Sequence, residues 1–141
     1  MKDTPSAEEH AVIRANEAFY KTFRERDMES MRAIWSTRET ISCTHPGTRT
    51  LYGRKAVLAS WKALLANPRT PRIIAAETRV SLVSETVALV TCHEGLESGG
   101  AALCATNLFL HEANAWRLLH HHTSALSPTP ARPAVAPGLL N

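Results

Sequence analysis

The sequence predicts an α+β domain in which three N-terminal helices cover one face of a strongly bent antiparallel sheet. Apolar residues recur at helical spacing only in the first half of the chain, up to about residue 66. Residues 72–125 instead form four long strand-like runs separated by short links of small or polar residues. Helices followed by antiparallel strands are typical of folds that keep their helices on one side of a sheet.

The first helix is expected to begin after Ser6. Ser6 and Glu9 have the spacing of a capping box, in which the hydroxyl accepts a backbone N–H and the carboxylate reaches back to the cap. Residues at helical spacing then form one side of the helix, at Val12, Asn16, Phe19 and Phe23, with Tyr20 beside them.

Two further helices are expected before residue 67. Asp27 can cap a short helix over about 28–36, because a carboxylate accepts the free N–H groups of a first turn. Gly53 precedes a third helix over about 54–66, whose apolar side includes Trp61. Asn67-Pro68 ends it, since the residue before a proline disfavours helical geometry.

The remaining elements are strands. Residues 40–44 are rich in β-branched side chains and form a short strand, which His45-Pro46-Gly47 stops. The long strands are expected over 72–83, 86–97, 101–112 and 116–125. The strands are long, and a long curved sheet usually wraps around something.

The composition indicates one domain over residues 1–125 and a proline-rich tail over 126–141. We expect this tail to be dispensable for folding. The net charge is +3 and the basic residues are scattered, which gives no support for nucleic-acid binding. We expect no membrane segment and no secretory leader, since no apolar run is long enough. Three cysteines without CxxC spacing suit the cytoplasm and predict neither a disulfide framework nor a metal site.

Four segments carry a resemblance to a known family. They are Ile34-Trp35 with residues 41–47 (ISCTHPG), residues 51–54 (LYGR) with 57–61 (VLASW), residues 105–109 (ATNLF), and residues 116–124 (WRLLHHHTS). Over residues 7–125 the chain resembles the nuclear transport factor 2-like superfamily, and within it the SnoaL-like small proteins. The resemblance implies a cone-shaped curved sheet, with the three helices closing a pocket, and a homodimer formed through the outer sheet face.

Strand alternation predicts which side chains share a face. A turn at 113–115 places Asn107 opposite His121, and a turn at 98–100 places Thr91 opposite Asn107. The next row on that face is His93, Ala105 and Thr123, and the opposite face carries Cys92, Thr106, Leu108, Leu118, His120 and His122. A resemblance to the kinase association domain of the same superfamily implies that Leu119, His121 and Thr123 point into the pocket.

The predicted ligand-binding residues are therefore Asn107, Trp61, Thr91, His93, Thr123 and Leu119. The candidate catalytic residues are His45, His121 and Tyr20, because imidazoles exchange protons near neutral pH and a phenol can stabilise an oxyanion. A metal site at His120–His122 is disfavoured, since adjacent side chains of a strand point in opposite directions. Glu94 is interpreted as a solvated or interface charge, and no cofactor is expected.

Two functions remain open at this point. The first is a dimeric protein that binds a small hydrophobic ligand in its pocket. The second is an enzyme of isomerase, cyclase or hydrolase type, acting on a small hydrophobic carbonyl or polyketide-like substrate. His45 or His121 would then be the general base, and Tyr20 and Asn107 would stabilise the oxyanion.

Overall fold

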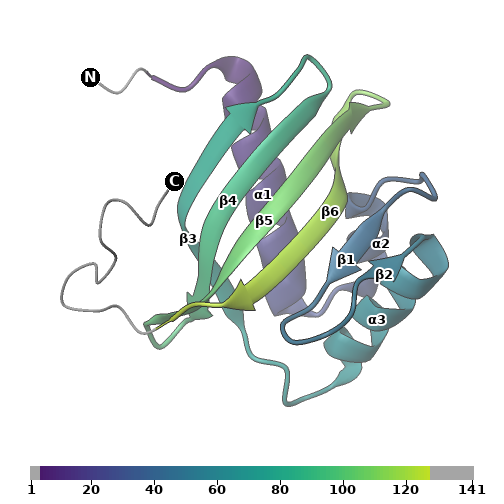
Figure 1. Ribbon diagram of the computed structural model, residues 1–141, viewed down its shortest axis with the longest axis vertical. Coiled ribbons are helices and arrows are strands. Elements are labelled where there is room, and N and C mark those ends of the chain that lie inside the picture. The colour runs from purple at the N-terminus through teal and green to yellow at the C-terminus, as the bar shows by residue number, and fades with distance from the viewer. Residues whose placement is uncertain (1–3, 128–141) are drawn as a thin grey trace, which may run out of the picture.

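The computed structural model describes residues 4–127 (Figure 1). Within them lie α1 (Ala7–Glu25), α2 (Met28–Ile34), β1 (Ser42–Thr44), β2 (Leu51–Tyr52), α3 (Arg54–Ala66), β3 (Ile73–Leu82), β4 (Val87–Leu96), β5 (Ala101–Glu112) and β6 (Ala115–Ala125). The predicted α+β class, with three helices and a curved sheet, is confirmed. The expected tail falls almost wholly outside the described residues.

The predicted helix caps form. The Glu9 backbone N–H donates to Ser6 Oγ at 3.1 Å, and the Ser6 N–H donates to Glu9 Oε1 at 3.0 Å. Arg26 ends α1 in the left-handed region at φ 56°. Asp27 then accepts the Ser30 N–H at 3.0 Å and starts α2. Local signals therefore set where these helices begin and end.

The sheet has the strand order β2-β1-β6-β5-β4-β3 and is curved but not closed (Figure 1). Strands β3 to β6 form the predicted antiparallel meander. Strand β1 pairs with β6 in parallel, so the sheet is mixed. The two-residue strand β2, which the sequence analysis did not predict, is too short to show an alternating pattern.

Two irregularities decide which side chains face the helices. Between β4 and β5 the pairing shifts at Gly95, and Asn107 lies opposite Val90 rather than Thr91. Between β5 and β6 the pairing skips Leu119, and Asn107 lies opposite His121 as predicted. An extra residue on one strand reverses the faces of all side chains beyond it.

The core lies between the sheet and the helices. Phe19 on α1 packs edge-on against Trp61 of α3, with ring centroids 5.4 Å apart, and both side chains are fully buried. The buried face of α1 includes the predicted residues at helical spacing. None of the helices in residues 4–127 is long and apolar enough to cross a membrane.

Candidate functional site

A small pocket opens on the helix side of the sheet, between α1, α3 and the ends of β1, β4 and β6. Its volume is about 170 Å³. Most of its wall is apolar, formed by Phe23, Trp61, Leu64, Pro71, Ile73 and Leu103. Its polar groups come from His45, Thr70, Glu94, His121 and Thr123. An apolar cavity with a few polar groups is the usual form of a small-molecule site, and this one is smaller than the roughly 300–1,000 Å³ typical of drug-sized ligands.

Glu94 is the polar residue that the sequence analysis placed wrongly. The side chain lies on the pocket wall and is 2% exposed, instead of being a solvated charge. Burial raises the pKa of Glu94 to about 7, against the opposing effect of its hydrogen bond from Tyr20. The shift at Gly95 turns Glu94 and Cys92 toward the helices. One signal was present in the sequence. Ala88, Val90 and Cys92 are apolar residues at alternate positions of the strand, and Glu94 is the next residue in this series, so it shares their face.

A buried hydrogen-bond network lies behind Glu94. Tyr20 donates from its hydroxyl to Glu94 Oε2 at 2.6 Å. Asn107 donates from Nδ2 to Asn16 Oδ1 at 2.8 Å and to the Tyr20 hydroxyl at 3.2 Å. Tyr20 and Asn107 are nearly or fully buried, and neither lies on the pocket wall. They hold the wall residues in place, which differs from the direct ligand contact expected of them.

His121 joins this network from β6. Its Nδ1 lies 2.5 Å from Asn107 Oδ1, and its Nε2 lies 3.8 Å from Glu94 Oε2. Burial, together with the neighbouring imidazole of His45, lowers the pKa of His121 to about 3. His121 is therefore neutral at pH 7. Because burial disfavours charge on both groups, the contact between His121 and Glu94 is not a pair of opposite charges.

His45 lies at the mouth of the pocket, after the end of β1. Its ring centroid is 5.1 Å from that of Trp61, and its Nε2 lies 2.9 Å from Ser60 Oγ. Burial lowers the pKa of His45 below its ordinary value. Of the residues predicted to line one cavity, His45, His121, Trp61 and Thr123 lie on its wall, whereas Asn107 and Tyr20 do not.

Besides Asn107, three predicted ligand-binding residues lie outside the pocket. Thr91 and His93 are on the outer face of the sheet, because the register between β4 and β5 differs by one residue from the predicted pairing. Leu119 is the residue skipped in the pairing of β5 with β6, and it packs against the core outside the pocket. Cys92 and Leu118 were expected on the outer face and are buried on the helix side. The register between β4 and β5 accounts for Cys92, and the skipped Leu119 accounts for Leu118.

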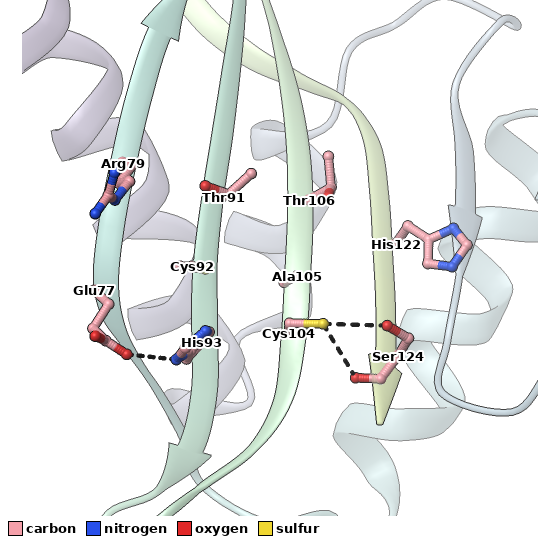
Figure 2. A pocket seen from close by; sticks show the side chains of 10 residues that line it. All are labelled: Glu77, Arg79, Thr91, Cys92, His93, Cys104, Ala105, Thr106, His122 and Ser124. Carbon is pink, nitrogen blue, oxygen red and sulfur yellow. Dashed lines mark hydrogen bonds and ion pairs between the residues drawn. The ribbon is translucent and has the colours of Figure 1, made fainter. Parts of the chain in front are cut away.

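The outer sheet face carries a second, polar hollow of about 400 Å³ (Figure 2). Glu77 Oε2 contacts His93 Nδ1 at 2.5 Å across β3 and β4. Figure 2 shows side chains of β5 and β6 on this face, where Cys104 Sγ lies 3.3 Å from Ser124 Oγ. The His120 and His122 rings are 6.0 Å apart, while His121 between them is buried on the helix side. This alternation matches the prediction for the three histidines.

The helix-side pocket is the better candidate for chemistry. Glu94 can gain or lose a proton near pH 7, and His121 presents a neutral imidazole beside it. Among residues 4–127, no three His, Cys, Asp or Glu side chains are arranged to hold a metal ion.

A curved sheet closed by helices over a small pocket defines the nuclear transport factor 2-like class of domain. Within this class, the SnoaL-like domain family matches residues 12–128, and the chain belongs to that family.

Solved structures support the fold assignment. A proposed dehydratase of the NTF2-like family from Streptomyces avermitilis is 28% identical with a TM-score of 0.77, over 89% of this chain and 100% of that chain. A proposed calcium/calmodulin-dependent protein kinase type II association domain from Thiobacillus denitrificans is also 28% identical, with a TM-score of 0.68, over 90% and 100% of the two chains.

One protein similar to this chain is considerably longer than it. The F-box protein SKIP8 of Arabidopsis thaliana is 26% identical over 116 residues, which cover 82% of this chain and 50% of that protein. The chain therefore spans about half the length of this curated relative.

Proposed function

We propose that the protein binds a small, mostly apolar molecule in the helix-side pocket and that Glu94 exchanges a proton with it. The observation that carries this proposal is the Glu94 carboxyl group, 2% exposed on the wall of an apolar pocket. Burial raises its pKa to about 7, where a group is best suited to act as both acid and base. A buried carboxyl group is costly to keep, and such groups are concentrated at functional sites.

In this proposal the general base is Glu94, whereas the sequence analysis expected His45 or His121 in that role. Burial lowers the pKa of both His45 and His121, so each is a weaker base than a free imidazole. The isomerase, cyclase or hydrolase alternative is therefore supported with Glu94 in the central role. Similarity to a proposed dehydratase agrees with acid–base chemistry on a small substrate.

A homodimer through the outer sheet face is part of this proposal. Support comes from the partly buried Leu108 and the paired His120 and His122 rings on that face. The face is more polar than predicted, since Cys92 and Leu118 point inward. A symmetric pairing of two sheets would cover the polar hollow as well as the leucine.

Fragment titration followed by ¹H–¹⁵N NMR tests the binding function. We expect small cyclic or branched fragments to shift the resonances of Trp61, Leu103 and Thr123. Leu103→Trp fills the pocket and should abolish these shifts, whereas Leu82→Trp, at an exposed site on β3, should preserve them. Shifts that persist in Leu103→Trp, or no pocket shifts with any fragment, would contradict the proposed binding site.

Proton exchange is tested separately by calorimetry. Titrations near pH 7 in two buffers of different ionisation enthalpy count the protons taken up or released on binding. We expect a fractional proton change in the wild type and none in Glu94→Gln, whose amide does not titrate. An unchanged proton count in Glu94→Gln would remove Glu94 from the acid–base role and leave a binding site alone.

A further inference from the structure

Two hydroxyl groups and one indole N–H on the pocket wall contact or are enclosed by protein atoms. Thr70 donates from its hydroxyl to the Leu64 carbonyl oxygen at 2.7 Å, and Thr123 donates to the Thr44 carbonyl oxygen at 3.5 Å. The indole N–H of Trp61 is fully buried, next to the Cys43 sulfur. The Thr70 hydroxyl is therefore engaged within the protein and its oxygen can only accept, whereas the Thr123 hydroxyl makes only a long contact.

The network behind Glu94 determines which nitrogen of His121 carries the proton. Because Tyr20 donates to Glu94, its oxygen accepts from Asn107, and the Asn107 Nδ2 therefore faces Tyr20. The Asn107 oxygen then faces His121 Nδ1, at 2.5 Å, and an amide oxygen can only accept. His121 is neutral, so its single N–H is on Nδ1 and its Nε2 is a bare acceptor.

The same reasoning applies to His45. Ser60 donates from its hydroxyl to the Val57 carbonyl oxygen at 2.7 Å, so the Ser60 oxygen is left to accept. His45 Nε2, at 2.9 Å, is therefore the donor to Ser60. The N–H groups of both imidazoles are used within the protein, and the remaining ring nitrogens are acceptors.

Glu94 Oε2 and His121 Nε2 lie 3.8 Å apart. This distance is too long for a direct hydrogen bond, and it is short enough for one oxygen atom to contact both groups. Below pH 7 the carboxyl group of Glu94 is largely protonated and can donate into this gap, while the Tyr20 hydroxyl is engaged with Glu94. A group bound there must accept from Glu94 and donate to His121.

Resting on the proposed function, we propose that the ligand is a small neutral alcohol, whose hydroxyl group donates to His121 Nε2 and accepts from Glu94. A ketone can only accept, and it would leave His121 Nε2 buried without a partner. A carboxylate would meet lone pairs in an apolar cavity, and an ammonium ion would lose its hydration there. The apolar wall, which includes Phe23, Trp61 and Ile73, suits a hydrocarbon body.

Cyclohexanol and cyclohexanone test this selectivity, because the two probes match in shape and differ in the hydroxyl proton. NMR titration of the full chain at about pH 6, below the pKa of Glu94, gives both dissociation constants. We expect cyclohexanol to bind at least about tenfold more tightly, the cost of one buried acceptor left unpaired. Equal binding, or tighter binding of the ketone, overturns the alcohol class and leaves the pocket function standing. If neither probe shifts the resonances of the pocket residues, and no fragment of the wider titration does so either, the proposed function itself is contradicted.

A variant pair assigns the preference to His121. His121→Phe should remove the preference for the alcohol, and His122→Phe, one residue away on the outer face, should keep it. Long-range ¹H–¹⁵N spectra of the wild type give an answer even if His121→Phe does not fold. We expect the Nδ1–H tautomer at His121 and the Nε2–H tautomer at His45, and an Nε2–H tautomer at His121 would overturn the inference.

Discussion

Tyr20 donates a 2.6 Å hydrogen bond to Glu94 Oε2 and so joins the middle of α1 to β4 across the interior. Burial, followed by the nearby Glu94 carboxylate, raises the pKa of Tyr20 far above its ordinary value, so the phenol does not ionise at physiological pH. Tyr20 is therefore a permanent donor to Glu94. The contact stabilises the negative form of the carboxyl group and keeps the pKa of Glu94 from rising further.

Glu94→Gln is expected to change how stability depends on pH. Since the pKa of Glu94 rises from 4.5 to about 7 on folding, its contribution to stability is fully present below about pH 4.5 and is lost as pH rises through about 7. Gln resembles the protonated form and loses nothing at high pH. We expect the variant to gain up to about 3 kcal/mol relative to the wild type between pH 4.5 and pH 8, measured by urea unfolding.

His121 titrates in the opposite sense, so the comparison must be made between proteins at each pH. Burial lowers its pKa from 6.5 to about 3, and its contribution to stability is lost as pH falls below 6.5. Subtracting the two unfolding curves removes this shared effect. Glu97→Gln, at an exposed position of the same segment, is the matched control and should show no pH-dependent difference. A constant difference for Glu94→Gln would contradict the raised pKa.

Asn107→Leu should destabilise the fold by about 2–4 kcal/mol. The substitution nearly preserves volume but removes the partner of Asn16, Tyr20 and His121, three groups that are buried. Chemical denaturation measures the loss, and Thr106→Val, next along the same strand on the outer face, is the control. A loss below about 1 kcal/mol would mean that these groups find other partners.

Gly95→Ala is expected to disturb both stability and the position of Glu94. A Cβ at residue 95 would overlap the Gly100 carbonyl oxygen, so the backbone must shift. We expect a loss of about 1–3 kcal/mol, as for other overpacked sites, and a weaker pH dependence of stability. Ser98→Ala, exposed in the following turn, should leave both properties unchanged. An unperturbed pH profile in Gly95→Ala would show that the glycine is not needed to orient Glu94.

The proposed dimer should weaken in acid. Burial lowers the pKa of His120, so its neutral form is favoured, and protonation in acid places charge beside His122. Light scattering should show a dimer at pH 8 and a larger dissociation constant at pH 5. The double variant His120→Asn, His122→Gln should lose this pH effect. A monomer at micromolar concentration, or a dissociation constant independent of pH, would contradict the predicted interface.

The sequence predicted the helices and long strands well, because caps, turns and apolar spacing are local signals. The pairing of Asn107 with His121 was also predicted, for a partly wrong reason. The observed turn is one residue shorter than expected, with Glu112 opposite Ala115, and the skipped Leu119 compensates for the difference. Neither feature has a clear signature in the sequence.

The site was predicted less completely, because a one-residue register shift exchanges the inward and outward faces of β4 and no second irregularity compensates for it. The irregularity at Gly95 exchanges Thr91 and His93 for Cys92 and Glu94 on the helix side. At this irregularity Gly95 lies so close to Gly100 that a Cβ at residue 95 would overlap its carbonyl oxygen, and this approach depends on tertiary geometry. Alternation together with the resemblance to the kinase association domain placed His121 in the pocket, while its carboxyl neighbour Glu94 was interpreted as a solvated or interface charge.

The parallel pairing of β1 with β6 affects how the chain acquires its pocket. Ser42 lies beside His120, and these residues are far apart along the chain. Contacts between distant segments form late, because closing a long loop costs entropy before any pairing can offset it. During ribosomal synthesis, α1 and α3 emerge well before β6, and they cannot enclose a cavity until that strand is available. The nascent chain therefore carries Trp61 and His45 without a binding site, and ligand recognition begins only once the sixth strand has docked.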